Sequence, residues 1–300
     1  MNMRVLVTGA HGQVGYELLQ RAPLGFVVFG YGSQDLDIGN AEQIRAVFDV
    51  VKPELVINAA AYTAVDKAES DADRAFAVNS DGVRLLATAA ERMGIPLLHI
   101  STDYVFNGEG DKPYTPDDVP NPTGVYGLSK LAGEKQLQSQ CSRHLVLRTS
   151  WVFGAHGNNF VKTMLRLGND RDTLSVVADQ YGGPTSAGSI ADALWTLALI
   201  FQRDGGLDWG VYHYSGVPAC SWHDFANEIF TRAVSLGLLK KSPEVKAIAT
   251  ADYPTPAKRP AWSVLDCAKL ADVHGVLPKS WTQELQAVLQ QLGNRRAIDG

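Results

Sequence analysis

The sequence has few cysteines and no long apolar run, and both absences narrow the classes of protein to which it can belong. Three cysteines, Cys141, Cys220 and Cys267, occur among 300 residues, and no two have metal or redox spacing. This pattern favours unpaired thiols in a reducing compartment. No apolar run reaches the roughly 18 residues of a transmembrane helix, and the N-terminal one is too short for a signal peptide. We therefore expect a cytoplasmic protein that does not enter a membrane.

Positive charge is also scarce. The chain carries 27 Lys and Arg residues against 32 Asp and Glu, for a formal net charge of −5. Without a basic stripe, nucleic acid is not an expected partner. An anionic ligand would have to be bound locally, by a helix N-terminus or by single Arg or Lys residues. The apolar content of 45% is enough for one large domain, alone or with a smaller lobe.

The first half of the chain alternates between strand and helix patterns. Apolar strand patterns occupy residues 4–8, 26–29, 54–58, 96–101 and 144–149. Helical patterns lie between them at 13–21, 40–51, 71–93 and 123–140, and Asn40 with Gln43 predicts a capping box. Apolar strands between amphipathic helices indicate a parallel sheet covered on both faces. We therefore predict an α/β fold with a doubly wound, Rossmann-like sheet.

The pattern becomes less regular after about residue 151. Short strands are expected at 174–177, 211–214 and 245–248, with helices beginning near Ser221 and Ser280. Three prolines in 252–260 predict an ordered loop. We expect a dinucleotide-binding domain over 1–150 and a smaller α/β substrate-binding lobe over 151–300, whose segments can interleave with the first domain.

A glycine-rich turn joins the first strand to the first helix. Gly9, Gly12 and Gly15 have the spacing G-x-x-G-x-x-G. In a dinucleotide site these glycines permit a tight turn, close approach to a pyrophosphate and close helix–strand packing. The motif alone also fits a turn without a ligand. Its position inside a β-α-β unit favours dinucleotide binding.

The end of the second strand bears on the choice of cofactor. The run from Phe29 to Ser33 has neither an acid for a ribose 2′-hydroxyl nor a cation for a 2′-phosphate. We therefore expect weak discrimination between NADH and NADPH. Asp37 and Ile38 follow and could line the adenine pocket, although Asp37 could equally be a surface turn residue.

Tyr126 and Lys130 lie four residues apart, on one face of a predicted helix. An ammonium beside a phenol would lower the phenol pKa and help it to exchange a proton during hydride transfer. The pair occurs by chance on many helices. Thr102, however, ends the fourth strand, at the edge where α/β folds bind ligands. The glycine turn, Thr102 and the Tyr–Lys helix together favour an oxidoreductase.

These motifs identify a family resemblance. The chain resembles the extended short-chain dehydrogenases, and among them the reductases of nucleotide-linked keto sugars. The matching segments are TGAHGQVG at 8–15, NAAAYTAVDKAE at 58–69, STDYVF at 101–106, YGLSKLAGE at 126–134, RTSWVFG at 148–154, GNNFVKTMLRL at 157–167, DQYGGPT at 179–185 and RPAWSVLD at 259–266. The resemblance implies reduction of the C4 keto group of dTDP-4-dehydro-β-L-rhamnose by NADPH or NADH. It also implies a place in rhamnose supply for surface polysaccharide such as O-antigen, and a possible homodimer.

The resemblance also implies roles for individual residues. Tyr126 is the acid that protonates the sugar oxygen, Lys130 supports it and holds the nicotinamide ribose, and Thr102 hydrogen-bonds the carbonyl. The implied substrate contacts are Thr102, Asp103, Tyr126, Trp151 and Arg259. The implied cofactor contacts are Gly9, Gly12, Gln13, Val14, Gly15, Asp37, Ile38, Ala61, Tyr62, Thr63, Tyr126 and Lys130.

Metal binding and three other activities remain to be weighed. Relatives are often described with Mg²⁺, but the stretch 188–192 offers one carboxylate, Asp192, where the resemblance leads us to expect two. We therefore name no metal ligand and leave Mg²⁺ as an open alternative. A dehydratase would carry Glu after Asp103, but Tyr104 stands there. Another nucleotide-sugar reductase or epimerase, and a non-catalytic NADP-binding regulatory subunit, stay open as alternatives.

Overall fold

The central sheet of the protein contains six parallel strands. The computed structural model describes residues 2–299, with side-chain detail for residues 2–294. The strand order is β2-β1-β3-β4-β5-β10. The strands are β1 (Met3–Thr8), β2 (Phe26–Tyr31), β3 (Leu55–Asn58), β4 (Leu97–Thr102), β5 (His144–Thr149) and β10 (Gly210–His213). All five pairings are parallel, as the apolar strand patterns predict.

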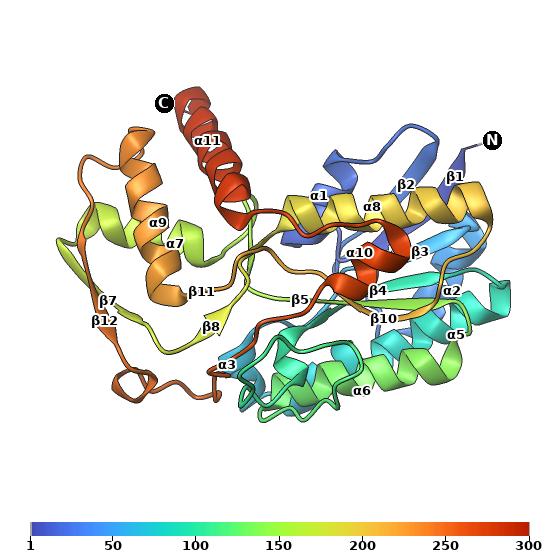
Figure 1. The fold of residues 1–300 in the computed structure, drawn as a ribbon. Helices are drawn as coiled ribbons and strands as arrows, with labels where there is room; N and C mark the ends of the chain where they lie inside the picture. Colours follow the sequence, from blue (N-terminus) through green and yellow to red (C-terminus); the bar gives the residue numbers. More distant parts are fainter. Residues whose placement is uncertain (1, 300) are drawn as a thin grey trace.

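Helices cover both faces of this sheet (Figure 1). On one face, Val5 and Val7 pack with α1 (Gln13–Gln20) and α8 (Ala187–Asp204). On the other, Leu6 packs with α2 (Ala41–Val51) and α5 (Val83–Met93), beside α6 (Val125–Gln140). Alternate residues of each strand thus enter opposite cores, because side chains in a strand point to alternate faces. The predicted doubly wound sheet is confirmed.

The strand order reverses next to β1. From β1 the chain moves outward to β2, and then crosses back over β1 to β3 on the other side. In open α/β sheets, ligands bind at the carboxyl ends of the strands at such a switch point. The glycine turn after β1 therefore lies where a ligand is expected.

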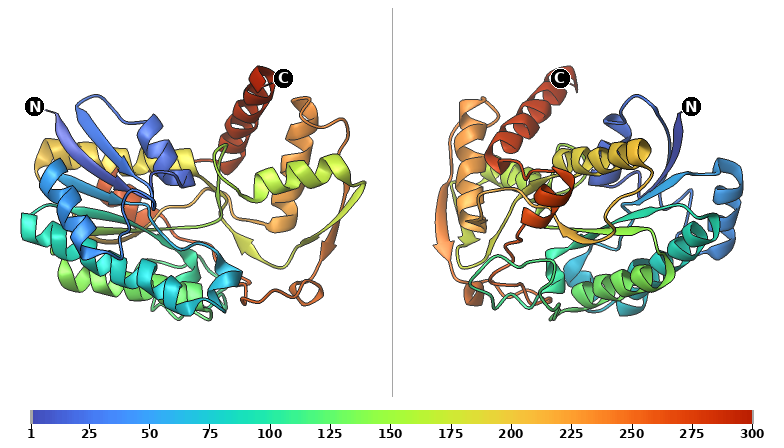
Figure 2. Two further views of the ribbon diagram at one scale, coloured as in Figure 1. Left: turned by 180° about the vertical axis from the view of Figure 1, so that it is seen from behind. Right: turned by 45° about the vertical axis from the view of Figure 1, so that its right-hand side comes forward.

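The second half of the chain contributes to two places. Strand β10 completes the central sheet beside β5, α8 covers that sheet, and α10 (Ala268–His274) packs on β10. The remaining helices, α7 (Phe160–Asp170), α9 (Trp222–Ser235) and α11 (Trp281–Asp299), form a lobe with the parallel pair β7 (Thr173–Val177) and β12 (Glu244–Ile248). Figure 2 shows this lobe beside the sheet in both views. Two short pairs complete the strands: β6 (Val152–Phe153) with β9 (Thr185–Ser186), and β8 (Tyr181–Gly182) with β11 (Cys220–Ser221).

The long helix predicted over residues 71–93 is interrupted. The structure has α4 (Ala72–Phe76), a π-helical turn at Ala77–Gly82 and then α5; a short α3 (Val65–Ala68) precedes them. Packing explains the π turn. An ideal Cβ on Gly133 of α6 would lie only 1.9 Å from the carbonyl oxygen of Asn79, so the two helices meet backbone to backbone there. Such π turns are frequent at functional sites.

One of the predicted helix caps is only half formed. The Asn40 side chain accepts hydrogen bonds from the backbone N–H groups of Glu42 and Gln43, as expected. The Gln43 side chain, however, accepts from the N–H of Asp37 instead of returning to Asn40. The predicted Asn40–Gln43 capping box is therefore wrong in its second half. The capping box of Ser221 with Asp224 is complete.

Candidate active site

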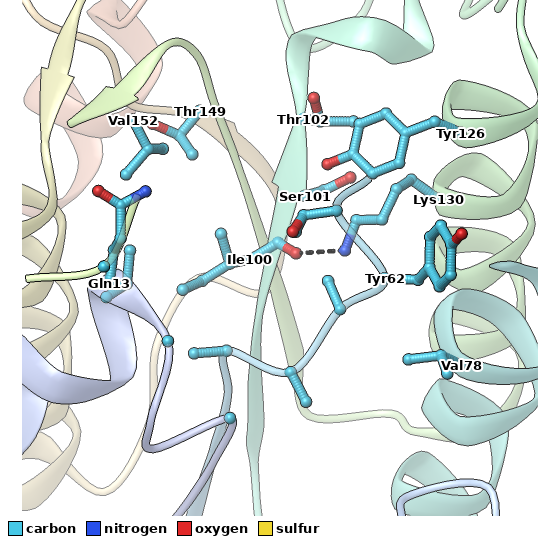
Figure 3. A pocket seen from close by; sticks show the side chains of 18 of the residues that line it. Gln13, Tyr62, Val78, Ile100, Ser101, Thr102, Tyr126, Lys130, Thr149 and Val152 are labelled. Carbon is cyan, nitrogen blue, oxygen red and sulfur yellow. Dashed lines mark hydrogen bonds between the residues drawn. The ribbon is translucent and has the colours of Figure 1, made fainter. Parts of the chain in front are cut away.

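A cavity of about 850 Å³ opens at the carboxyl ends of β1, β3 and β4. The glycine turn borders it on one side and α6 on the other, so that Gln13 faces Tyr62 and Lys130 across it (Figure 3). Apart from Gly15 and Arg259, every residue predicted to contact cofactor or substrate lines this one cavity. They are Gly9, Gly12, Gln13, Val14, Asp37, Ile38, Ala61, Tyr62, Thr63, Thr102, Asp103, Tyr126, Lys130 and Trp151.

The glycine turn has the geometry of a pyrophosphate cradle. Gly9 has a φ of 71°, and an ideal Cβ there would lie 2.5 Å from the backbone nitrogen of Ala60. A Cβ on Gly15 would lie 2.1 Å from the carbonyl oxygen of Gly9, so α1 packs tightly against the turn at this glycine. Gly15 thus supports the turn without lining the cavity. Gly12 precedes α1, and no side chain caps the helix there. The first N–H groups of α1 are thus available to an anion.

The cavity continues past the ends of β2 and β3. Asp37 and Ile38 border this part together with Gly32, Ser33 and Leu36. The loop with Tyr62 is fixed by the side chain of Asn79. This amide accepts from the backbone N–H of Tyr62 at 2.8 Å and donates to the backbone carbonyl of Tyr62 at 3.1 Å. The π turn that carries Asn79 therefore fixes the loop that lines the cavity.

Thr102 and Tyr126 meet at the inner end of the cavity. The Thr102 hydroxyl donates to Asp103 Oδ1 at 3.0 Å and accepts from the backbone N–H of Tyr104 at 3.2 Å. Burial raises the pKa of Tyr126 above its ordinary value, as does the nearby Asp103, while the Thr102 contact lowers it in part. The expectation that Lys130 lowers the phenol pKa is therefore wrong for this structure, because desolvation of the phenolate dominates. Tyr126 is a neutral phenol, which is the form that can donate a proton.

Lys130 is nearly completely buried, with only 2% of the residue exposed. Its Nζ donates to the carbonyl oxygen of Ile100 at 2.7 Å (Figure 3) and lies 3.3 Å from Nε2 of His99. Burial lowers the pKa of Lys130 to about 8, against the opposing effect of Glu134. Near neutral pH this group can therefore be either charged or neutral.

Two polar atoms of the cavity wall have no hydrogen-bond partner. Among the residues with described side chains, the buried unpaired side-chain atoms are Asp103 Oδ2 and Thr149 Oγ1. Both residues line the cavity. Because buried polar atoms are nearly always paired, two unpaired atoms in one cavity indicate a polar ligand. Burial also raises the pKa of Asp103 to about 6.

Trp151 connects the cavity to the lobe. It has a φ of 46°, which is rare for a bulky residue, and such strain is common at ligand sites. Its ring stacks on Trp222 with centroids 3.6 Å apart. A Cβ on Gly182 would lie 2.5 Å from the indole, so the glycine makes room for it. Trp222 was not predicted, since the stack joins residues far apart in sequence.

Arg259 lies beside the cavity and is not part of its lining. Its guanidinium forms a 2.6 Å ion pair with Asp66 of α3 and a 3.1 Å hydrogen bond to the hydroxyl of Tyr104. Tyr104 in turn packs edge-on against Tyr126. The structure thus brings Arg259 to the active site through Tyr104.

Several lining residues escaped the sequence prediction. Arg74 of α4 borders the cavity, but nothing distinguishes it in the sequence from an ordinary surface arginine. Thr149 and Ser150 lie in the segment RTSWVFG, which could have identified them. The others are Gly32, Ser33, Leu36, Ala59, Ala60, Val65, Val78, Ile100, Ser101, Tyr104, Val152, Gly157 and Asn158.

The residues around Asp192 do not fit a metal ion. Its carboxylate accepts from Lys279 Nζ at 2.8 Å and lies 3.3 Å from Nη1 of Arg21. Two cations thus occupy the place where a hard metal would need further oxygen ligands. Among the described residues, no group of three or more His, Cys, Asp or Glu side chains has a metal-binding arrangement. Nor does that part of the chain contain a helix with the length and hydropathy needed to cross a membrane.

Comparison with known proteins agrees with this site. The family model "RmlD substrate binding domain" matches residues 3–294. The dTDP-4-dehydrorhamnose reductase of Aggregatibacter actinomycetemcomitans is 46% identical over 287 residues, or 95% of this chain and 98% of that one. The enzyme of the same name from Escherichia coli K12 is 39% identical, covering 99% of this chain and 100% of that one.

Solved structures give the same result. The dTDP-4-dehydrorhamnose reductase of Bacillus anthracis in complex with NADP has a TM-score of 0.89 and 35% identity, covering 97% of this chain and all of that one. A UDP-glucose 4-epimerase of Thermus thermophilus in complex with NAD, at 22% identity and a TM-score of 0.78, shares the fold alone; 97% of this chain and 99% of that one are covered. The chain therefore belongs to the dTDP-4-dehydrorhamnose reductase family of the extended short-chain dehydrogenases.

Proposed function

We propose that the chain reduces the C4 keto group of dTDP-4-dehydro-β-L-rhamnose to the hydroxyl of dTDP-L-rhamnose, with NADPH or NADH as the hydride donor. The observation that carries the proposal is the single cavity that joins the glycine turn to Thr102, Tyr126 and Lys130. The names of the relatives add the sugar nucleotide and, for one solved structure, NADP.

The chain would bind the cofactor along one side of the cavity. The N–H groups at the start of α1, which no side chain caps, fit a pyrophosphate. Asp37 and Ile38 would border the adenosine, and Ala61, Tyr62 and Thr63 the middle of the molecule. Arg74 is a cation at the cavity wall that could interact with a phosphate group. When bound, the reduced nicotinamide supplies a hydride to the carbonyl carbon.

The proton for the sugar oxygen would come from Tyr126. Its raised pKa keeps the phenol protonated at neutral pH, and a developing alkoxide is basic enough to take that proton. Thr102 would turn its hydroxyl proton from Asp103 Oδ1, its acceptor in this structure, to the same oxygen and so orient it. Lys130, held by Ile100, would face the ribose and return a proton to Tyr126.

The sugar nucleotide would occupy the side of the cavity nearest the lobe. Asp103 Oδ2 and Thr149 Oγ1 are unpaired there and would hydrogen-bond sugar hydroxyls. Trp151 would offer its apolar ring to the deoxysugar. In this proposal the substrate-binding part begins near residue 151, although β10 from that half joins the sheet and α8 covers it. Arg259 would act at the substrate end through its contact with Tyr104.

Analysis of the product and of bound cofactor tests this proposal against its rivals. A reductase should release oxidised cofactor and form dTDP-L-rhamnose in equal amounts, as measured by chromatography and NMR. An epimerase would instead purify with tightly bound NAD and consume none. A regulatory subunit would bind NADPH without turnover.

We also propose that the enzyme works in the cytoplasm and forms a homodimer. All three cysteines are unpaired and buried, which suits a reducing compartment. Light scattering of the purified protein measures its mass in solution, and one chain has a mass of 32.4 kDa. A particle of twice this mass is expected, and a single-chain mass would contradict the dimer.

A further inference from the structure

A row of buried polar side chains crosses the sheet below the cavity. Thr8, Asn58 and His99 are register partners on the adjacent strands β1, β3 and β4. The Thr8 hydroxyl donates to Asn58 Oδ1 at 2.7 Å, and Asn58 Nδ2 lies 2.9 Å from His99 Nδ1. The row continues to α6, where His99 Nε2 lies 3.3 Å from Lys130 Nζ. It thus begins next to the glycine turn and ends at Lys130.

The direction of these hydrogen bonds follows from one backbone group. The N–H of Ala60 donates to Asn58 Oδ1 at 3.0 Å, and a backbone N–H can act only as a donor. The other end of the Asn58 amide is therefore NH₂, and it must donate to His99 Nδ1. A neutral imidazole that accepts at Nδ1 carries its proton on Nε2. His99 is neutral because burial, together with the nearby Lys130, lowers its pKa well below the ordinary value.

The Nε2 proton of His99 therefore points at Lys130. An ammonium has only donors and would oppose this N–H, whereas a neutral amine has a lone pair that can accept from it. We propose that His99 is a positioning residue for Lys130. The fixed Nε2–H group of His99 favours the neutral amine at Nζ of Lys130. Asn58 and Ala60 serve this role indirectly, since they determine which imidazole nitrogen carries the proton.

Other charged groups near Lys130 have identifiable effects. Glu134, one turn further along α6, favours the ammonium. Its carboxylate is already bound by Arg148 of β5, at 2.7 Å, and by Ser101 of β4. The cavity wall near Lys130 contains further titratable residues. They lie on α6, on elements that pack on α6, or in the loop after β3, and are Tyr62, Arg74, Asp103, Tyr104 and Tyr126.

The effect of His99 on Lys130 would also matter for the proposed reaction. Of the statements about His99, only this one depends on that reaction. A less basic Lys130 gives up its proton more readily and is a better donor for returning a proton to Tyr126 after each turnover. Burial already lowers the pKa of Lys130 to about 8, and the N–H group of His99 would act in the same direction.

Nitrogen-15 NMR of histidine-labelled protein tests the tautomer directly, with the His99 signals assigned by their loss in His99→Gln. We expect a protonated Nε2 and an unprotonated Nδ1 across neutral pH. A protonated Nδ1, or an imidazolium at neutral pH, would overturn the proposal.

Carbon-13 NMR of lysine labelled at Cε tests the effect on Lys130, assigned by Lys130→Met. In His99→Leu the titration midpoint of Lys130 should rise by about one pH unit, whereas His99→Gln, which can keep an N–H at this place, should shift it less. The control is His213→Gln, because His213 is equally buried but contacts Arg148 and Tyr114. An unchanged midpoint in folded His99→Leu would contradict the proposal.

If His99→Leu does not fold, Asn58→Asp decides. A carboxylate still accepts from Ala60 and Thr8 but cannot donate to His99, so the imidazole proton should move to Nδ1 and the Lys130 midpoint should rise. Unchanged histidine signals would refute the proposed role of Asn58. Neither NMR measurement requires turnover. Failure of the proposal for His99 can therefore be told apart from failure of the reductase assignment.

Discussion

The hydroxyl of Thr102 donates a hydrogen bond to Asp103 Oδ1 at 3.0 Å, while the other carboxylate oxygen of Asp103 has no partner. The two neighbouring residues thus divide the work at the end of β4. Thr102 directs its hydroxyl to Asp103, and Asp103 keeps one unpaired oxygen at the cavity wall. The structure bears a desolvation penalty for this, seen in the raised pKa of Asp103.

Asp103→Asn is therefore expected to stabilise the protein and to weaken substrate binding. In the folded chain Asp103 has a pKa of about 6, above its ordinary value near 4. Its ionisation thus costs the folded state stability as pH rises through this range. The amide should raise the free energy of unfolding by up to about 3 kcal/mol at pH 7 and by little at pH 4. Urea unfolding at both pH values measures this, and equal gains at both would contradict the explanation.

Substitutions in the glycine turn should separate cofactor binding from folding. At Gly12 an ideal Cβ would meet only the carbonyl oxygen of Gly9, at 3.2 Å, so Gly12→Ala should fold but lose roughly tenfold or more in NADPH affinity. At Gly15 a Cβ would lie 2.1 Å from the same oxygen, so Gly15→Ala should lose roughly 2–4 kcal/mol of stability. Fluorescence titration and thermal unfolding measure the two effects. Unchanged NADPH affinity in Gly12→Ala would argue against a pyrophosphate at this turn.

Much of this site could be predicted because its motifs are local. The Tyr–Lys spacing and the glycine spacing each act within one helix or turn, and apolar strands reveal the sheet that aligns them. The pKa of Tyr126 could not be predicted in this way, because it depends on burial by distant segments. The same holds for the row from Thr8 to His99, which exists only through the register of three strands. The π turn likewise depends on tertiary contact, at Gly133.

Arg259→Lys should raise KM by roughly tenfold with a smaller effect on kcat. A lysine cannot replace a guanidinium that contacts both Asp66 and the Tyr104 hydroxyl. The loss should loosen Tyr104, which packs against Tyr126. Arg203→Lys is the matched control, because the ion pair of Arg203 with Asp204 is exposed. Steady-state kinetics of both variants measure the effect. Equal KM values for Arg259→Lys and Arg203→Lys would contradict a role of Arg259 at the substrate end of the cavity.

Chelation of divalent metal should leave activity unchanged. The carboxylate of Asp192 is already neutralised by Arg21 and Lys279, so it does not need a cation from solution. Initial rates are measured after dialysis against EDTA and again after addition of Mg²⁺. A loss of activity that Mg²⁺ restores would show a metal requirement elsewhere in the protein.

Reduction of the sugar nucleotide is tested by mixing the protein with NADPH and dTDP-4-dehydro-β-L-rhamnose and following the loss of NADPH absorbance, for the wild type and for Tyr126→Phe. We predict rapid oxidation by the wild type and a loss of roughly 10²–10⁴-fold in kcat for the variant, with NADPH affinity retained. Turnover by Tyr126→Phe at the wild-type rate would contradict the role of Tyr126 as the acid. Absence of oxidation by wild-type protein that binds NADPH would contradict the proposed reaction itself.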